Sequence, residues 1–348
     1  MIKFGTGGWR AIIGEEFTKA NIQKLSKGLA LKMKDEAVAE RGIVIGYDRR
    51  FLSKEAMRWA GEIFAAEGIE AYLINRSSPT PMIMHYVMHH KLPYGMMVTA
   101  SHNPAIYNGI KVFTYGGRDA DELQTQEIEN YIAGVDDSEV IGLDYEWAKA
   151  KGLIHEINPL NEYIDAIVSR VNMQAIRDRG LRIALDPMYG VSETSLKTIL
   201  LTARCHVDTI HDRHDTLFGG KLPSPSAATL RSLQNRVIDD NLDIGIATDG
   251  DADRIGVIDD TGKFLHPNDI LVVLYYYQHS LDRILRRFPQ ARVLRKGKDG
   301  VEDIRAWNND EIPILCLHPK SAGHGLNLQE SSCQTVIWFD QIWKIGRA

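Results

Sequence analysis

Apolar and polar residues alternate along the first half of the chain with two different periods. Apolar positions spaced three and four residues apart predict helices over 17–40, 54–67 and 80–89, the last of which opens at Pro81. Short apolar runs at 43–47, 71–74 and 96–100 predict buried strands. Because strands and helices alternate, the pattern predicts an α/β fold in which helices cover a mixed sheet.

The pattern is interrupted twice, which divides the chain into three parts. A polar, irregular stretch at 136–161, with a short helix at 145–150, marks the first boundary. Alternation then restarts, and a second boundary falls near 261–262. The elements expected after the first boundary are a strand at 181–185, helices at 192–201, 228–237 and 267–277, and a loop at 217–226. The expected domains are therefore 1–150, 151–262 and 263–348.

Composition and charge narrow the class of protein. The chain has 348 residues, 44% hydrophobic and 25% charged, and its net charge is −5. These values are ordinary for a globular protein and do not indicate a nucleic-acid-binding surface. No apolar run approaches the roughly 20 residues that span a bilayer, and the N-terminus lacks a signal-peptide pattern. Because the three cysteines show no metal or disulfide spacing, we expect a cytoplasmic protein without a membrane or nucleic-acid partner.

The most informative segment is DGDADR, which places Asp249, Asp251 and Asp253 at alternating positions between two apolar runs. Carboxylates this close repel one another unless a cation lies among them, and hard oxygen ligands favour Mg²⁺. The alternatives are an acidic surface turn and a calcium loop of the EF-hand type. The EF-hand loop requires Gly at its sixth position and Glu at its twelfth, which are Arg254 and Asp260 here, so we exclude it.

A second segment, TASHNP at 99–104, follows a predicted strand directly. Ser101 lies in a turn that Pro104 stops, a position from which a hydroxyl can project into a cleft. An ordinary polar turn is the alternative. Acyl transfer by Ser101 and His102 is disfavoured, because the G-x-S-x-G pattern is absent and adjacent residues rarely face each other as nucleophile and base.

Two further segments carry candidate cations. The run GTGGWR, which ends at Arg10, can cradle an anion with its backbone amides and bind phosphate through the guanidinium; a mobile N-terminus is the alternative. It is not a dinucleotide fingerprint, because Arg10 stands at the third glycine position. In YNGIK, the pair Asn108-Gly109 favours a turn, after which Lys111 enters a strand. On its own, Lys111 is typical of an exposed lysine.

Together these four segments resemble the α-D-phosphohexomutase family, the phosphoglucomutases and phosphomannomutases. The glycine–arginine loop, TASHNP, NGIK and DGDADR occur in the family's order and at about its spacing. The runs GYDRR at 46–50 and DPMYG at 186–190 are also similar to family segments. The resemblance covers residues 1 to about 280. It implies repeated mixed-sheet α/β domains, two complete and a third partial.

By this resemblance, Ser101 carries a phosphoryl group, and Mg²⁺ is held by Ser101, Asp249, Asp251 and Asp253. Family members pass the phosphoryl group to a hexose monophosphate, and the resulting hexose 1,6-bisphosphate reorients and returns its other phosphate. The net reaction interconverts hexose 1-phosphate and hexose 6-phosphate. Lys111 matches a family lysine that helps to move the proton of the attacking hydroxyl.

A charge count indicates which other residues the site needs. Three carboxylates, one Mg²⁺ and a phosphoserine leave a charge of about −3, which cannot gather further phosphate unaided. The cations that match the family are Arg10, Arg254 and Lys111, with His102 as a further candidate. We therefore expect these four side chains near Ser101.

The sequence departs from the family after about residue 285. The Glu-x-Ser-Gly loop of the family's third domain and the Arg-x-Ser-Gly-Thr loop of its fourth are not found, and SAGH at 321–324 is a faint echo of the former without its Glu. We therefore expect the fourth domain to be absent, either through truncation, for example by a frameshift, or in a short variant with a rebuilt C-terminal region. Three functions stay open: a hexose-phosphate mutase, an inactive member that binds Mg²⁺ and carries phosphoserine, and a non-enzymatic binding module.

Overall fold

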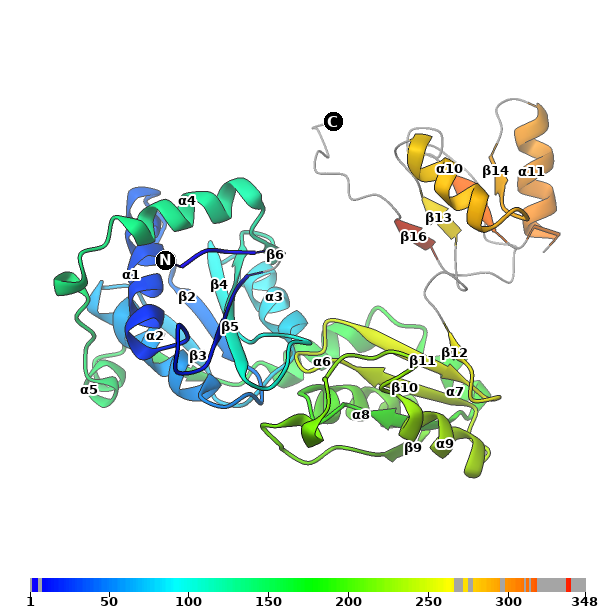
Figure 1. The fold of residues 1–348 in the computed structure, drawn as a ribbon, viewed down its shortest axis with the longest axis horizontal. Coiled ribbons are helices and arrows are strands. Elements are labelled where there is room, and N and C mark those ends of the chain that lie inside the picture. Colours follow the sequence, from blue (N-terminus) through cyan, green and yellow to red (C-terminus); the bar gives the residue numbers. More distant parts are fainter. Residues whose placement is uncertain are drawn as a thin grey trace. The chain divides into compact units, whose positions relative to one another are not determined.

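A computed structural model describes residues 2–5, 8–265, 272–274, 278–294, 298–309, 311–312, 314–317 and 336–338. Contacts divide the chain into two compact units, Met1–Phe264 and Leu265–Ala348 (Figure 1). The first unit holds two sheets and the second unit one, each with helices packed on it.

The first sheet has seven strands in the order β1-β5-β4-β2-β3-β7, with β6 paired to β5. Strands β4, β2, β3 and β7 are parallel to one another, whereas β5 is antiparallel to β1, β4 and β6. The predicted mixed sheet is therefore confirmed. The strands are β1 (Trp9–Ile12), β2 (Ile43–Tyr47), β3 (Ala71–Ile74), β4 (Tyr94–Val98), β5 (Tyr107–Thr114), β6 (Arg118–Asp119) and β7 (Ile154–Ile157).

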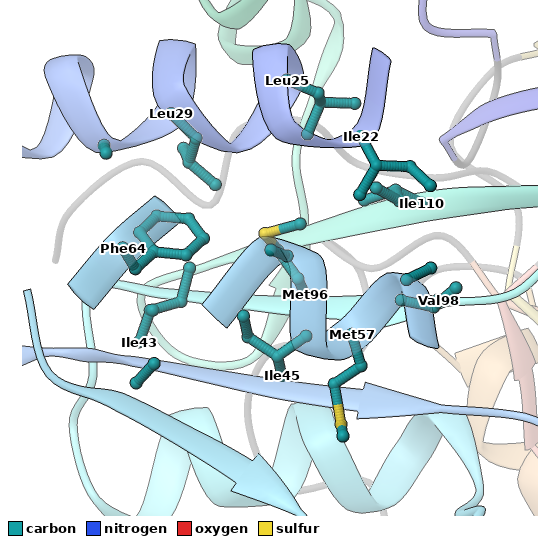
Figure 2. Close-up of a cluster of buried hydrophobic side chains, with 14 of the residues drawn as sticks. Ile22, Leu25, Leu29, Ile43, Ile45, Met57, Phe64, Met96, Val98 and Ile110 are labelled. Carbon is teal, nitrogen blue, oxygen red and sulfur yellow. The ribbon is translucent and has the colours of Figure 1, made fainter. Parts of the chain in front are cut away.

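Helices cover both faces of this sheet, which explains why its central strands are apolar throughout. On β2, Ile43 and Ile45 contribute to a core shared with helices α1 and α2 (Figure 2), whereas Val44 packs on the opposite face against α3. Helix α1 begins after Thr18, whose hydroxyl accepts a hydrogen bond from the Asn21 amide. The helices are α1 (Lys19–Asp35), α2 (Ser53–Ala66), α3 (Thr80–His89), α4 (Glu122–Ala133) and α5 (Tyr145–Ala150), with 3₁₀ turns at Ala39–Arg41 and Asp137–Glu139.

The first sheet differs from expectation in two places. The predicted turn at Asn108-Gly109 is wrong, because both residues lie inside β5. There the Asn108 side chain donates to Phe51 O and Ser53 Oγ, and a Cβ on Gly109 would lie 2.1 Å from the carbonyl oxygen of Trp9. Strand β7 was not predicted, and it extends the first sheet beyond residue 150 by pairing with β3.

The second sheet has the order β12-β11-β10-β8-β9. Its parallel strands β8, β9 and β10 are followed by the antiparallel strand β11, and the acidic turn joins β10 to β11, as predicted. The strands are β8 (Arg182–Asp186), β9 (His206–Thr209), β10 (Ile244–Thr248), β11 (Ile255–Asp259) and β12 (Phe264–Leu265). The helices are α6 (Leu160–Val168), α7 (Met173–Arg179), α8 (Ser192–Thr202) and α9 (Arg231–Asp239), with a 3₁₀ turn at Phe218–Gly220.

The second unit contains a parallel sheet in the order β14-β15-β13-β16. On β15, Cys316 packs with α10 residues such as Leu281, whereas Leu315 packs with Trp307 of α11. Apolar clusters therefore lie on both faces of this sheet. Its elements are β13 (Val272–Leu274), α10 (Gln278–Arg287), β14 (Arg292–Val293), α11 (Lys298–Asn308), β15 (Leu315–Leu317) and β16 (Val336–Trp338).

The predicted helix at 267–277 is wrong where the structure describes it, because Val272–Leu274 is strand β13. Two adjacent β-branched valines favour a strand, and parallel partners pair with it on both sides. The SAGH segment at 321–324 lies outside the described residues. Among the described helices, none is both long and apolar enough to cross a membrane.

Candidate functional site

Ser101 lies in the turn after β4, three residues beyond the last residue of that strand. Its backbone is left-handed, with φ of 51°, a conformation that few non-glycine residues adopt. The Ser101 amide donates to Thr99 Oγ1 at 2.8 Å, and Thr99 Oγ1 donates to Asp48 Oδ2 at 2.7 Å. The serine is therefore held in a strained position by side chains next to the core.

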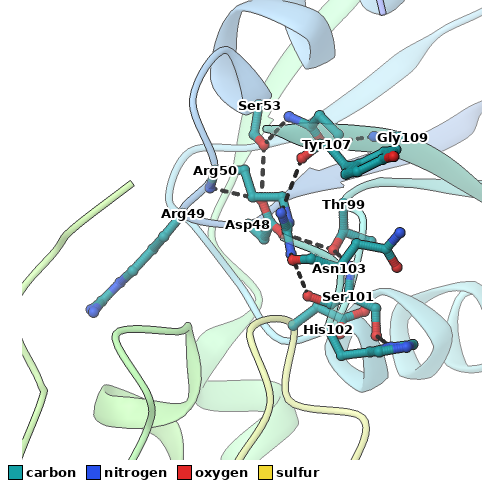
Figure 3. Close-up of polar contacts among 12 residues, drawn as sticks. Asp48, Arg49, Arg50, Ser53, Thr99, Ser101, His102, Asn103, Tyr107 and Gly109 are labelled. Carbon is teal, nitrogen blue, oxygen red and sulfur yellow. Dashed lines mark hydrogen bonds and ion pairs between the residues drawn. The ribbon is translucent and has the colours of Figure 1, made fainter. Parts of the chain in front are cut away.

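Arg50 holds the rest of this turn (Figure 3). Its guanidinium donates to four backbone carbonyl oxygens, those of Ser101, Asn103, Pro104 and Tyr107, at 2.6 to 3.0 Å. Asp48 lies 3.4 Å from Arg50 Nε, and both side chains are fully buried. Burial raises the pKa of Asp48 and the Arg50 charge opposes that rise, so the pair is stable only as an intact network.

The acidic turn meets Ser101 from the second sheet. Ser101 Oγ donates to Asp249 Oδ2 at 2.9 Å, although the two residues are 148 positions apart in sequence. Asp249 Oδ1 accepts from the amides of Asp253 and Arg254, each at 3.1 Å. A Cβ on Gly250 would lie 3.0 Å from the Ser101 carbonyl oxygen, so glycine lets the two turns approach closely.

Lys111, on β5, forms ion pairs with two carboxylates of the acidic turn. Its Nζ lies 2.7 Å from Asp251 Oδ2 and 2.6 Å from Asp253 Oδ2. Burial lowers the pKa of Lys111, but the two carboxylates raise it by more, so the ammonium stays protonated at neutral pH. Thr80, at the start of α3, also binds Asp251: its hydroxyl donates to Oδ2 at 2.7 Å and its amide to the carbonyl oxygen at 2.9 Å.

The three carboxylates fit a divalent cation. One oxygen each from Asp249, Asp251 and Asp253 lies within 4.8 Å of the others. Burial and the charges of the other two carboxylates raise the pKa of Asp249 to about 8, which shows how unfavourable the crowded negative charge is. Asp251 Oδ1 is buried and has no hydrogen-bond partner among the described residues. An oxygen-rich set with an unused buried ligand atom matches the preference of Mg²⁺.

The other predicted cations lie on the elements around Ser101. Arg10 pairs with Gly109 across β1 and β5, so Arg10 and Lys111 are diagonal neighbours on one face of the sheet. Arg254 is exposed at the end of the acidic turn. His102 Nδ1 lies 3.5 Å from Ser101 Oγ, and burial, with the charges of Arg254 and Arg10, lowers the His102 pKa. A neutral imidazole is therefore favoured in this arrangement.

Sequence reasoning missed three residues that build the site: Asp48, Arg50 and Thr80. Asp48 and Arg50 belong to the GYDRR run, which stands out in the sequence only because it is similar to a segment of the family. A pair of opposite charges directly after a wholly apolar strand is the signal that could have identified them. Thr80 had no such signal, because its role depends on a contact with Asp251, 171 positions away.

Family models and individual relatives both match this chain. Two family models match: phosphoglucomutase/phosphomannomutase alpha/beta/alpha domain I over residues 1–139, and domain II over residues 161–262. A Methanobrevibacter smithii protein assigned as a phosphoglucosamine mutase is 31% identical over 271 residues, 78% of this chain and 58% of its own length. A phosphoglucosamine/phosphogalactosamine mutase of Sulfurisphaera tokodaii is 28% identical over 269 residues, 75% of this chain and 55% of its own length.

A solved structure has the same arrangement of elements. A Thermus thermophilus protein, assigned as a phosphomannomutase, superposes with a TM-score of 0.71 at 26% identity, over 82% of this chain and 67% of its own. The chain thus spans a little over half the length of the curated relatives it matches. Because the two domain models together match well over half of this chain, it belongs to the phosphoglucomutase/phosphomannomutase family, the α-D-phosphohexomutases.

Proposed function

We propose that this chain is a phosphohexomutase in which Ser101 accepts and returns the phosphoryl group of a hexose or hexosamine phosphate. The observation that carries the proposal is the hydrogen bond of 2.9 Å from Ser101 Oγ to Asp249, within a cluster of three carboxylates. A strained serine beside an oxygen-ligand set and a buried lysine suits phosphoryl transfer, which depends on positioning and charge neutralisation.

We propose that Asp249, Asp251, Asp253 and Ser101 hold Mg²⁺. When bound, the ion would neutralise charge on the transferring phosphoryl oxygens. Transfer breaks the bond from phosphorus to Ser101 Oγ and forms a bond from phosphorus to the oxygen of a sugar hydroxyl, and the proton of that hydroxyl ends on Ser101 Oγ. The Lys111 ammonium would bind the phosphoryl oxygens and relay the proton, donating one to Ser101 Oγ and taking one from the sugar hydroxyl, while Arg10 and Arg254 add positive charge. His102, 3.5 Å from Ser101 Oγ, is the remaining candidate.

Access to Ser101 requires a local movement. The residue is 1% exposed, so a sugar phosphate reaches Oγ only after the contacts that cover it have opened. The hydrogen bond to Asp249 occupies the hydroxyl and has to be given up first. We infer that substrate binding and opening of the contacts between the Ser101 turn and the acidic turn are coupled.

The proposal also covers the candidate substrates and the domains that supply the site residues. Relatives named as phosphoglucosamine mutases make glucosamine phosphate a candidate beside glucose and mannose phosphates. The first domain, which extends past the expected boundary at 150 to include β7 (Ile154–Ile157), would supply Ser101 and Lys111, and the second, up to 262, would supply the three aspartates. Residues 263–348 would form a partial or altered third domain. Hexose 1,6-bisphosphate would serve as intermediate and activator.

The test measures two events separately. The purified chain is incubated with Mg²⁺ and glucose 1,6-bisphosphate, and phosphate on Ser101 is measured by intact mass and peptide mapping. Conversion of glucose 1-phosphate and glucosamine 1-phosphate is followed in parallel. The matched control is Ser101→Ala, which removes one oxygen from the site, and a second control replaces Mg²⁺ with EDTA.

We expect phosphate on Ser101 and turnover in the wild type, and neither in Ser101→Ala or in EDTA. Phosphate on Ser101 without turnover of any hexose phosphate would favour the alternative, a family member that binds Mg²⁺ and carries phosphoserine but does not convert sugar. A folded chain that never acquires phosphate on Ser101 would contradict both and favour a binding module.

A further inference from the structure

A second group of metal-ligating side chains lies at the opposite end of α3 from Thr80. His85 and His89 stand four residues apart on this helix, on one face, and Glu162 comes from the adjacent helix α6. One ligand atom from each of the three side chains lies within 4.8 Å of the others. The group shares no residue with the site around Ser101.

Two atoms of this group are buried and lack hydrogen-bond partners. His85 Nε2 and Glu162 Oε1 are both enclosed, have no hydrogen-bond partner in the described part of the chain, and face each other at 3.6 Å. The other carboxylate oxygen, Glu162 Oε2, lies 3.1 Å from His90 Nε2, which fixes the orientation of the carboxylate. Unpaired buried donors and acceptors are rare in proteins, so this pair requires an explanation.

The spacing suits a tetrahedral metal ion. Ligands at about 2.0–2.1 Å from a tetrahedral centre are about 3.3–3.4 Å apart, close to the observed separation of His85 Nε2 and Glu162 Oε1. The neutral imidazole of histidine is the form that binds metal.

We propose that His85, His89 and Glu162 bind Zn²⁺, with water as the fourth ligand. Two imidazoles and one carboxylate are the ligand set that zinc takes, whereas Mg²⁺ prefers oxygen ligands alone. The two groups of metal-ligating side chains among the described residues would therefore select different ions. This inference does not depend on the proposed function, because it rests on a separate group of residues.

Zinc at this position would connect the two family domains. Helix α3 packs on the first sheet, whereas Glu162 lies in the segment that matches domain II. Thr80, at the start of α3 and about 8–14 Å along the helix from His85 and His89, binds Asp251 of the acidic turn. An ion that fixes α6 against α3 would therefore restrain the two segments whose separation opens the Ser101 site.

The test measures zinc binding to the full chain by equilibrium dialysis in excess Mg²⁺, which occupies the carboxylate site. The main variant is His89→Ala, because His89 is exposed and its loss leaves the core intact. A second variant, Glu162→Gln, keeps the size of the side chain. The matched control is His155→Ala: His155 Nε2 lies 3.2 Å from Glu70 and belongs to no three-ligand group among the described residues.

We expect one zinc ion per wild-type chain beyond any bound at the carboxylates, and an increase in the thermal unfolding midpoint on adding Zn²⁺. His89→Ala and Glu162→Gln should each weaken this binding by at least about tenfold and abolish the increase, whereas His155→Ala should change neither. Absence of zinc binding in the wild type, or equal binding in His89→Ala, would overturn the proposal whatever the phosphorylation assay shows.

Discussion

At the scale of single residues, the site depends on side chains that are both buried and charged. Lys111 contacts two carboxylates, and Asp251 has in addition an oxygen without a partner. Buried charges are stable only with partners, so each of these side chains constrains the others. In the proposed function, a fixed ammonium such as that of Lys111 would match the charge of a phosphoryl group at a defined position.

The first prediction concerns Lys111. Replacement by Met keeps most of the side-chain volume and removes the charge, so the rate at which Ser101 is phosphorylated should fall by about 100-fold. The measurement is intact mass as a function of time at saturating Mg²⁺. Lys24→Met is the control, because Lys24 pairs with Asp137 on the surface and should leave the rate unchanged. A wild-type rate in Lys111→Met would exclude the lysine from the transfer.

At the scale of elements, the turn after β4 is held by β2 and by the residues that follow it. Arg50 donates to four carbonyl oxygens of this turn, of which that of Pro104 also accepts from the Tyr107 amide. The strained φ of Ser101 persists because this network holds both of its flanks. The turn is thus a rigid platform, although its residues form no regular element.

Arg50→Lys is the second prediction. A lysine cannot reproduce the planar fork of donors, so several carbonyls would lose their partner and the free energy of unfolding should fall by about 2–4 kcal/mol. Urea denaturation measures this change. For comparison, Arg177→Lys alters a half-buried arginine that contacts a single carbonyl, that of Thr202, at 3.4 Å. Equal, small losses in both variants would show that Arg50 does not hold the turn.

A third prediction concerns the contact of α1 with α2. Glu67 accepts from Lys27 at 2.5 Å and from Lys34 at 2.6 Å. Burial raises the pKa of Glu67, but the two lysines lower it by more. Its stabilisation is therefore present above the ordinary carboxyl pKa and is lost as the pH falls through the lowered pKa of the folded state.

Glu67→Gln should accordingly reduce the free energy of unfolding by about 1–2 kcal/mol at pH 7, and by progressively less below about pH 4. Urea denaturation at a series of pH values measures the difference. The exposed Glu15 provides the control, since Glu15→Gln should cost little at any pH. A Glu67→Gln deficit that is independent of pH would refute the assignment to the ion pairs.

At the scale of the whole molecule, every predicted site residue lies in the first of the two compact units. The two sheets of this unit meet through the Ser101–Asp249, Thr80–Asp251 and Lys111–Asp251 contacts. The second unit, with its own parallel sheet and apolar clusters, contributes none of these groups. Phosphorylation of Ser101 and conversion of sugar can therefore depend on different parts of the chain.

The fourth prediction follows from this division. A chain that ends at Leu265 keeps all strands of the first two sheets, so it should fold and acquire phosphate on Ser101 at a rate within about threefold of the full chain. Circular dichroism and intact mass measure the two properties. Ser101→Ala in the same short chain serves as the control. Failure of the short chain to fold would show that the first unit needs residues beyond 265.

Much of the local structure could be predicted from the sequence. The apolar run at 43–47 and the helical spacing at 80–89 match β2 and α3, and DGDADR joins two strands as expected. The misses arose where a neighbour outweighed local preference. Asn108-Gly109 favours a turn in isolation, but strands on both sides of β5 hold it extended, and β13 is a strand between two parallel partners.

By itself, the sequence determined the periods of its elements and the residue types of the site, because hydrophobic spacing and clustered carboxylates are local properties. The tertiary structure alone decided which residues meet. Ser101 reaches Asp249 across 148 positions, Thr80 binds Asp251, and Arg50 closes the turn that carries the serine. Such contacts depend on how strands pair and pack across the whole sheet, and no short stretch of sequence encodes that arrangement.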